Sequence, residues 1–168
     1  MGTTILTDNK KDNHKQASKH AATEWFIFGV VVFMMLLFSY TAVNKLLEYK
    51  SFVFQMQLAP VPMMKWLAPI LGWLVPLTEL VLTLGLYLTR TRVIALVGSL
   101  ILMIAFEGYI IWMKLTGLDL PCTCGGIISA MGWTTHLIFN ATIIVLIAVA
   151  LTLWKTVVNN KKALYTIH

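Results

Sequence analysis

The stretch WFIFGVVVFMMLLFSYTAV, residues 25–43, is 19 residues long and carries no charged side chain. A helix needs about 20 apolar residues to cross roughly 30 Å of bilayer hydrocarbon. Because a backbone surrounded by lipid must satisfy its own hydrogen bonds, such a stretch is expected to be helical. It therefore predicts a membrane-spanning helix and makes the bilayer the solvent of the fold.

Three further apolar runs of similar length follow the first, at residues 66–88, 93–113 and 133–154. Tryptophan rings prefer the headgroup level of a bilayer, and tryptophans stand at or near many ends of these runs. They are Trp25, Trp66, Trp112, Trp133 and Trp154. The expected fold class is all-α, a polytopic membrane protein built as a bundle of four transmembrane helices.

The connection between the first two runs, residues 44–65, reads NKLLEYKSFVFQMQLAPVPMMK. Its first part alternates apolar and polar residues loosely at helical spacing, until Pro60 and Pro62 break the pattern. This pattern predicts a short interfacial helix after the first span. The next connection, residues 89–92, is short enough to predict a tight hairpin.

Composition supports the membrane reading and argues against nucleic acid as a partner. Of the 168 residues, 58% are hydrophobic and only 12% are charged, and the mean hydropathy is +0.79. Soluble domains are about one quarter charged, so this chain has too little charge to cover a surface that faces water. The net charge of +6 comes from basic residues at the ends of the chain and between the apolar runs, as in membrane proteins.

The chain is expected to hold one membrane domain with a polar tail at each end. Residues 1–24 contain four lysines, no apolar stretch precedes them, and no small-residue cleavage site follows the first run. These features predict a cytosolic tail rather than a cleaved signal peptide. The expected division is the tail 1–24, the membrane domain 25–155 and a cytosolic tail 156–168.

The distribution of Lys and Arg predicts the orientation of the bundle. Nine of them lie in the segments on one side of the membrane, 1–24, 89–92 and 155–168. Four lie in the segments on the other side, 44–65 and 114–132. By the positive-inside rule, both termini are expected in the cytosol. The segment 114–132 is then periplasmic, outside the cytoplasmic membrane.

That segment contains LPCTCGGIISAMGW, residues 120–133, with Cys122 and Cys124, the two cysteines of the chain. A disulfide is permitted on the oxidising side of the membrane, but a ring this small is strained and readily reduced. Such a small ring also restricts the unfolded chain little, so a disulfide that only stabilises the fold is disfavoured and a redox pair is the leading hypothesis.

Inert thiols remain an alternative, since the reactivity of a cysteine needs a lowered thiol pKa. A zinc site usually has about four protein ligands. Beside the two cysteines only His136 is an obvious further ligand, so no metal is predicted.

Turn-forming residues surround the cysteines. Pro121 fixes the entry, and Gly125 and Gly126 let the backbone fold back sharply and leave the sulfur atoms uncovered. A partner protein can approach such an uncovered dithiol closely. The same residues also suit a simple tight turn before the last helix, and both interpretations stay open.

Ionisable side chains inside membrane spans are costly and therefore suggest function. Glu107 is expected about 9 Å below the outer boundary and His136 about 5 Å below it, both beneath the cysteine segment. His136 would take a proton from a thiol, Glu107 would orient His136, and Asn140, one turn further, would donate a hydrogen bond. The alternative is that these three side chains only join helices by hydrogen bonds.

Glu79, about 20 Å below Trp66, is expected to be a structural partner for another helix, with a proton relay as the alternative.

Three stretches carry a resemblance to a known family: NKLLEYKSF after the first span, VPLTELVLTLGLYL in the second, and PCTCGGIISAMGWTTHLIFN around the cysteines. Together they resemble the DoxX/MauE group of membrane proteins, and the MauE branch more closely, over about residues 25–155. The resemblance implies that Cys122 and Cys124 are a redox pair. It marks Lys45, Glu79 and Asn140 as family positions of unclear role.

The group is similar in architecture to the quinone-linked vitamin K epoxide reductase and DsbB enzymes. MauE itself is implicated in disulfide formation in a periplasmic partner during methylamine dehydrogenase maturation. This chain departs from the pattern in two ways, since CTCGG replaces the common CGCFG and no second cysteine pair is present. Electrons would therefore pass directly from Cys122 and Cys124 to a quinone or to a partner protein.

Two functions follow as hypotheses. The first is a membrane thiol–disulfide oxidoreductase that exchanges its Cys-x-Cys disulfide with a periplasmic thioredoxin-like or substrate protein. Cys122, Cys124, His136 and Glu107 are its candidate catalytic residues, and a quinone is its candidate cofactor, although no dedicated quinone motif is present. The alternative is a non-enzymatic subunit or assembly factor of a larger envelope complex. A transporter is a weaker third reading, since the chain is short and has few charges at the midplane.

Overall fold

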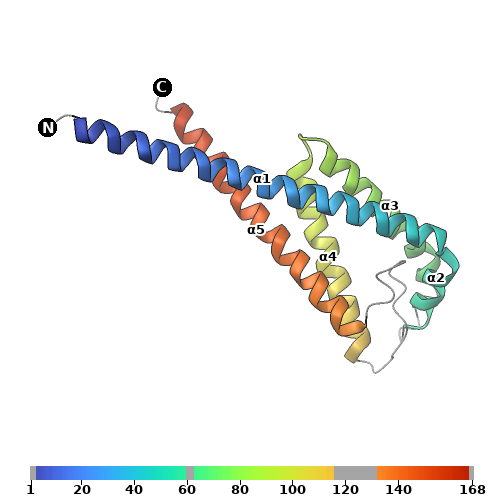
Figure 1. Ribbon diagram of the computed structural model, residues 1–168. Coiled ribbons are helices and arrows are strands. Elements are labelled where there is room, and N and C mark those ends of the chain that lie inside the picture. The colour runs from blue at the N-terminus through green and yellow to red at the C-terminus, as the bar shows by residue number, and fades with distance from the viewer. Residues whose placement is uncertain (1–2, 60–62, 116–131, 167–168) are drawn as a thin grey trace.

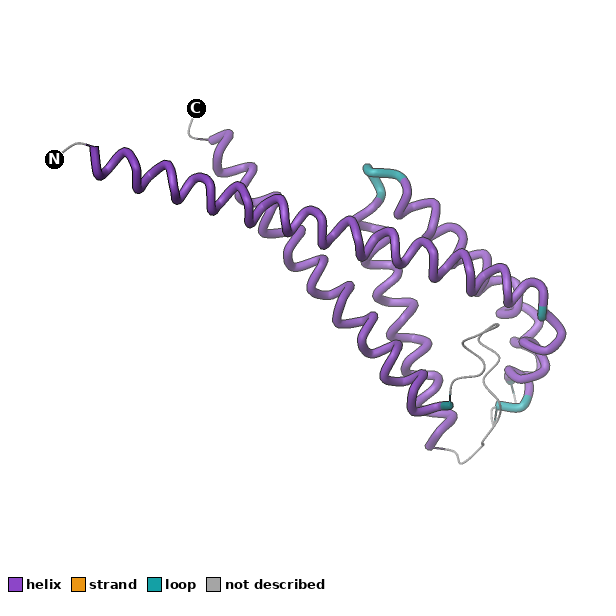
Figure 2. Tube along the Cα trace, in the orientation of Figure 1, coloured by secondary structure: helices purple, strands orange, loops and turns teal. Residues whose placement is uncertain are grey.

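The computed structural model describes residues 3–59, 63–115 and 132–166, and all of its regular structure in these ranges is helical. The helices are α1 (Thr3–Leu47), α2 (Tyr49–Gln57), α3 (Met64–Tyr87), α4 (Arg92–Leu115) and α5 (Trp133–Thr166). Figures 1 and 2 show α1 and α5 as the long members, with α3 and α4 beside them and the small α2 at one end. The all-α prediction is confirmed.

Four of these helices contain segments long and apolar enough to cross a membrane: Ala21–Leu47, Met64–Tyr87, Arg92–Leu115 and Thr134–Val157. Large apolar side chains are exposed along all four, among them Leu36, Val81, Ile101 and Val145. Apolar side chains facing outward are what a bilayer requires of a helix bundle. The chain is therefore a multi-pass membrane protein.

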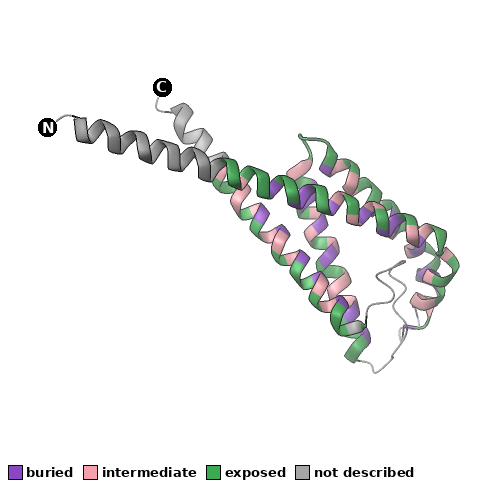
Figure 3. Cartoon of the chain, in the orientation of Figure 1, coloured by how far each residue is buried: buried purple, intermediate pink, exposed green. Residues whose placement is uncertain are grey.

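The buried residues of α5 show how the sequence selects the inner face of a helix. His136, Asn140, Ile143, Ile147 and Ala150 are all buried, at alternating spacings of four and three residues. This spacing places them on one face of a helix. Figure 3 shows the corresponding stripes of buried residues along the helices.

The interior of the bundle is filled by large apolar side chains from different helices. Met34 and Phe38 of α1, Leu86 of α3, Leu96 of α4 and Ile147 of α5 belong to one cluster. Each of these side chains is at most 1% exposed. Helices with apolar outer faces gain little from hydrophobic burial in lipid, so close packing and polar contacts must hold this bundle together.

Helix α2 confirms the predicted helix after the first span and packs closely on α3. The chain bends at Glu48, where φ is −101° and ψ is 31°, so that α2 turns away from α1. Tyr49 Oη then donates a hydrogen bond of 3.1 Å to the Pro69 carbonyl, and the Tyr49 ring lies 5.3 Å from that of Trp73. Close approach depends on Gly72, because a Cβ there would lie 2.6 Å from Cγ2 of Val53.

The predicted hairpin between the second and third spans forms between Tyr87 and Arg92. Thr91 Oγ1 donates a hydrogen bond of 2.9 Å to the Gly85 carbonyl. Arg92 Nε donates one of 3.2 Å to the Leu86 carbonyl. These two side chains satisfy carbonyls at the end of α3, which a helix leaves without partners.

Candidate functional site

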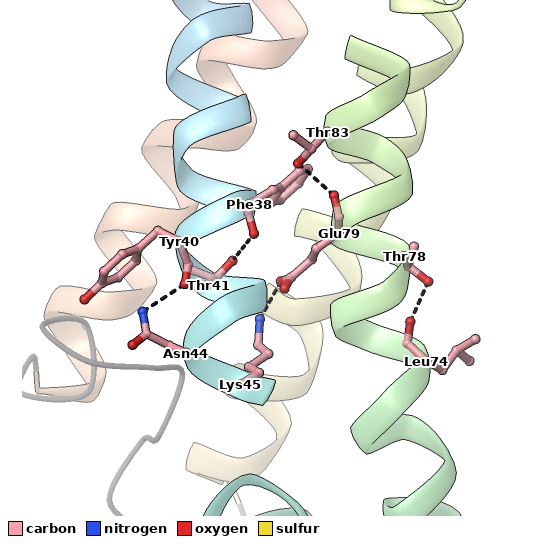
Figure 4. Close-up of polar contacts among 9 residues, drawn as sticks. All are labelled: Phe38, Tyr40, Thr41, Asn44, Lys45, Leu74, Thr78, Glu79 and Thr83. Carbon is pink, nitrogen blue, oxygen red and sulfur yellow. Dashed lines mark hydrogen bonds and ion pairs between the residues drawn. The ribbon is translucent and has the colours of Figure 1, made fainter. Parts of the chain in front are cut away.

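Charged side chains meet inside the membrane at the contact between α1 and α3. Lys45 stands near the end of α1, and its ammonium pairs with Oε1 of Glu79 in the second half of α3 (Figure 4). The side chains are only 5% and 1% exposed. An ion pair this deeply buried cancels two charges that would each be costly in hydrocarbon.

Aromatic rings complete the surroundings of the Lys45 ammonium. Its nitrogen lies 5.0 Å from the ring centre of Phe106 in α4 and 5.9 Å from that of Phe52 in α2. Cations are attracted to ring faces at such distances. The single ammonium of Lys45 thus contacts groups from α2, α3 and α4, and fixes the end of α1 against all three.

Two further hydrogen bonds near this pair are local to each helix. Thr83 Oγ1 donates to the Glu79 carbonyl at 2.9 Å, and Thr41 Oγ1 donates to the Phe38 carbonyl at 3.3 Å (Figure 4). The second carboxylate oxygen of Glu79, Oε2, is buried and accepts no hydrogen bond from the part of the chain that the structure describes. The geometry is that of a pair that joins helices.

Sequence reasoning did not identify the pairing of Lys45 with Glu79. The sequence predicts Lys45 in the connection 44–65, whereas the structure includes it in α1, which ends at Leu47. The presence of Glu79 in a span is the feature of the sequence that could have indicated this pairing. A buried carboxylate in a span needs an opposite charge, and Lys45 is the first cation after an uncharged run of 19 residues.

A second polar region lies at the other pair of helices, α4 and α5. His136 and Asn140 are each 4% exposed, and they face the bundle interior together with Ile143 one turn further. They are one helical turn apart, as their spacing predicts. The backbone N–H of His136 donates to the Gly132 carbonyl at 3.0 Å, which places His136 in the first turn of α5.

Glu107 enters this region from α4. Its Oε2 atom is buried and has no hydrogen-bond partner within residues 3–59, 63–115 and 132–166. Lys114 Nζ and Thr134 Oγ1, 3.3 Å apart, join the adjacent ends of the two antiparallel helices. Counting from this contact, Glu107 lies about 10 Å into the bundle, Asn140 about 9 Å and His136 about 3 Å. Glu107 is therefore level with Asn140, and His136 is nearer to the connecting segment.

That connecting segment, residues 116–131, holds both cysteines. Cys122 and Cys124, and with them Pro121, Gly125 and Gly126, lie outside the described residues. The structure describes the two ends between which they run, Leu115 of α4 and Gly132 before α5. His136 follows four residues after the second end. Among the described residues, no group of three or more His, Cys, Asp or Glu side chains is arranged to hold a metal ion.

Four spanning helices with an interior ion pair and a second polar region at one end define a small multi-pass membrane protein. Residues 23–153 match the family described as methylamine utilisation protein MauE, and the match includes both polar regions and the cysteines. The chain belongs to the MauE family, as the sequence motifs suggest. No curated protein and no solved structure matches the chain.

Proposed function

We propose that this MauE-family protein is a membrane thiol–disulfide redox protein whose Cys122 and Cys124 exchange a disulfide with a periplasmic partner. The observation that carries the proposal is the buried polar region of His136, Asn140 and Glu107. It lies at the end of α4 and α5 between which the cysteine segment runs.

The state of Glu107 supports a chemical role over a purely structural one. Glu79 also has a buried Oε2 without a hydrogen-bond partner in the described residues, but the Lys45 ammonium balances its charge, whereas Glu107 forms no ion pair in those residues. Oε2 of Glu107 is buried without a partner in the described part of the chain. An ionisable side chain inside a membrane span suggests function, and Glu107 stands eight residues before Leu115, where the described part of α4 ends ahead of the cysteine segment.

The proposed exchange starts from a disulfide between Cys122 and Cys124. A thiolate of the partner attacks one of the two sulfur atoms, the Cys122–Cys124 bond breaks, and a mixed disulfide forms. The second thiolate of the partner then attacks its own bridged sulfur and releases the partner as a disulfide. Two electrons and, at equilibrium, two protons have moved to Cys122 and Cys124.

The residues beneath the segment would control the thiolates. His136 near Cys122 or Cys124 would take a proton from the thiol and stabilise the thiolate, and Glu107 would orient His136. Return to the disulfide needs a two-electron acceptor, for which we propose a membrane quinone that leaves as the quinol. The partner would be a thioredoxin-like or substrate protein, and the family's description suggests one that serves methylamine utilisation.

Trapping the mixed disulfide tests this proposal. In the single variants Cys122→Ala and Cys124→Ala, the remaining thiol cannot be resolved within its own chain, and the variant that keeps the exchanging sulfur should accumulate a covalent adduct that reductant removes. The double variant is the matched control. In wild-type membranes, a heavy maleimide should label two thiols together only after mild reductant. Full labelling without reductant, unchanged by oxidant, would leave the scaffold role instead.

Orientation is tested independently, because the exchange requires the cysteine segment to face an oxidising compartment. A reporter active only outside the cytoplasmic membrane should be active when fused after Gly117 and silent when fused after Asn159. The reverse result would place the thiols in the reducing cytosol and remove the basis for a disulfide.

A further inference from the structure

A cavity of about 590 Å³ opens at one end of the bundle, where α1 and α5 continue past the turn between α3 and α4 (Figure 1). Three of its lining residues mark the ends of apolar runs: Trp25 begins the first run, Arg92 directly precedes the third, and Trp154 ends the fourth. Such positions lie at the headgroup level of a bilayer. Ligand pockets commonly have volumes of about 300–1,000 Å³, so this cavity can hold a sizeable part of a ligand.

One wall of the cavity is aromatic. It is formed by Trp25 and Phe28 of α1 and by Trp154 of α5. Trp25 is 73% exposed and Phe28 is 52% exposed, so both rings are open to a ligand rather than packed in the core. A small anion would leave this apolar surface uncovered, whereas an acyl chain would cover it.

Arg92 supplies hydrogen-bond donors beside this wall. Its Nε donates a bond of 3.2 Å to the Leu86 carbonyl, which fixes the guanidinium. The other four N–H groups, on Nη1 and Nη2, have no acceptor among the residues that the structure describes. A guanidinium with open donors can bind a phosphate through two parallel hydrogen bonds. Glu24 also lines the cavity but already has an interaction partner, so Arg92 is the charged lining residue left to recognise a headgroup.

The charge around the cavity favours an anionic headgroup. The segments that form this end of the bundle, residues 21–30, 84–95 and 150–157, carry three cations and one acid. The cations are Arg90, Arg92 and Lys155, and the acid is Glu24. This excess attracts a headgroup with a net negative charge and opposes the ammonium of a zwitterionic one. Basic pockets between transmembrane helices bind anionic lipids in this way.

We propose that this cavity binds an anionic phospholipid, with its phosphate on the Arg92 guanidinium and an acyl chain along Trp25, Phe28 and Trp154. Helix α4 has 24 residues and is therefore about 36 Å long, so Arg92 lies that far along the helix from the end where the cysteine segment begins. The site is independent of the proposed thiol chemistry, and either can fail without the other.

Native mass spectrometry of the full chain, released from detergent, tests the site. The probes are phosphatidylglycerol, phosphatidylethanolamine and phosphatidylcholine with identical acyl chains, and inorganic phosphate, each added separately. We expect the wild type to retain phosphatidylglycerol most strongly. Arg92→Gln should weaken that retention roughly three- to tenfold and remove the preference over the zwitterionic lipids, because charge-assisted hydrogen bonds are strong but are weakened by nearby water. Arg92→Lys keeps the charge without the planar fork and should retain an intermediate amount.

Two matched controls separate the parts of the site. Arg90→Gln removes the same charge from a residue of the same turn that does not line the cavity, so its loss should be clearly smaller than that of Arg92→Gln. Phe28→Ala removes part of the aromatic wall and should lower the retention of all three lipids. Leu36→Ala, an outward-facing change on α1 away from the cavity, should not.

The exposed Phe28 carries the test even if Arg92→Gln fails to fold. Equal retention of the three lipids by the wild type, or a preference for a zwitterionic lipid, would overturn the proposal. So would equal losses in either matched pair of variants. Retention of inorganic phosphate as strong as that of the lipid would assign the cavity to a small anion instead.

Discussion

Polar groups enter the membrane interior at two places in this bundle, and the two places treat them differently. Between α1 and α3, Lys45 and Glu79 cancel each other's charge, enclosed by the rings of Phe106 and Phe52. Between α4 and α5, Glu107 forms no ion pair within the described part of the chain, although its buried Oε2, like Oε2 of Glu79, accepts no hydrogen bond there. The first arrangement suits a permanent joint between helices. The second suits the role proposed for Glu107 beside His136.

The largest loss of stability is expected when one charge of the Lys45–Glu79 pair is removed. Lys45→Met leaves the Glu79 carboxylate alone in a buried site, and breaking a buried pair from one side costs about 3–5 kcal/mol. The midpoint of unfolding in detergent should fall steeply. The double variant Lys45→Met with Glu79→Leu removes both charges and should recover most of the loss. A double variant as unstable as the single one would show that the pair does more than cancel charge.

A second, smaller effect is expected where α2 packs on α3. Gly72→Ala places a Cβ 2.6 Å from Val53 Cγ2 and 2.8 Å from Cε2 of Tyr49, which forces the two helices apart. Overpacking of this kind costs about 1–3 kcal/mol. Gly29→Ala is the control, since a Cβ there meets nothing within 4 Å. It should be neutral or slightly stabilising in the same unfolding measurement, and an equal loss in both variants would rule out the steric explanation.

Replacing Glu107 should affect stability least. Glu107→Leu removes a carboxylate whose Oε2 has no hydrogen-bond partner among the described residues, so the free energy of unfolding should change by no more than about 1 kcal/mol. Glu79→Leu, which strands the Lys45 ammonium, should be several-fold more costly in the same assay. Comparable losses in the two variants would mean that Glu107 joins helices as Glu79 does.

The sequence predicts the spans well because long uncharged runs have few alternatives to a transmembrane helix. It also predicts that His136 and Asn140 share a face, since a spacing of four residues is a property of one helix. The pairing of Lys45 with Glu79 depends instead on the register between α1 and α3, which no local pattern records. Likewise, the tight contact of α2 with α3 depends on the missing side chain of Gly72, whose importance appears only with Val53 opposite it.

The roles of Cys122 and Cys124 stay a prediction, because residues 116–131 lie outside the described part of the chain. The described neighbours still restrict the test to a few side chains. His136 lies closest to the segment along α5, and Glu107 lies deeper on α4. Variants of these two residues can therefore be compared with variants of the Lys45–Glu79 pair in one assay.

The most direct test of the account is the pH dependence of thiol alkylation in the reduced, folded protein. A neighbouring cation lowers the pKa of a thiol, so His136→Ala should raise the pKa of the affected cysteine and slow alkylation at neutral pH. Glu107→Gln, which removes a charge but keeps the size, should shift the profile in the same direction by less. The Lys45→Met and Glu79→Leu double variant should match the wild type. Identical profiles in all four proteins would contradict the account and leave His136 and Glu107 as residues that only pack helices.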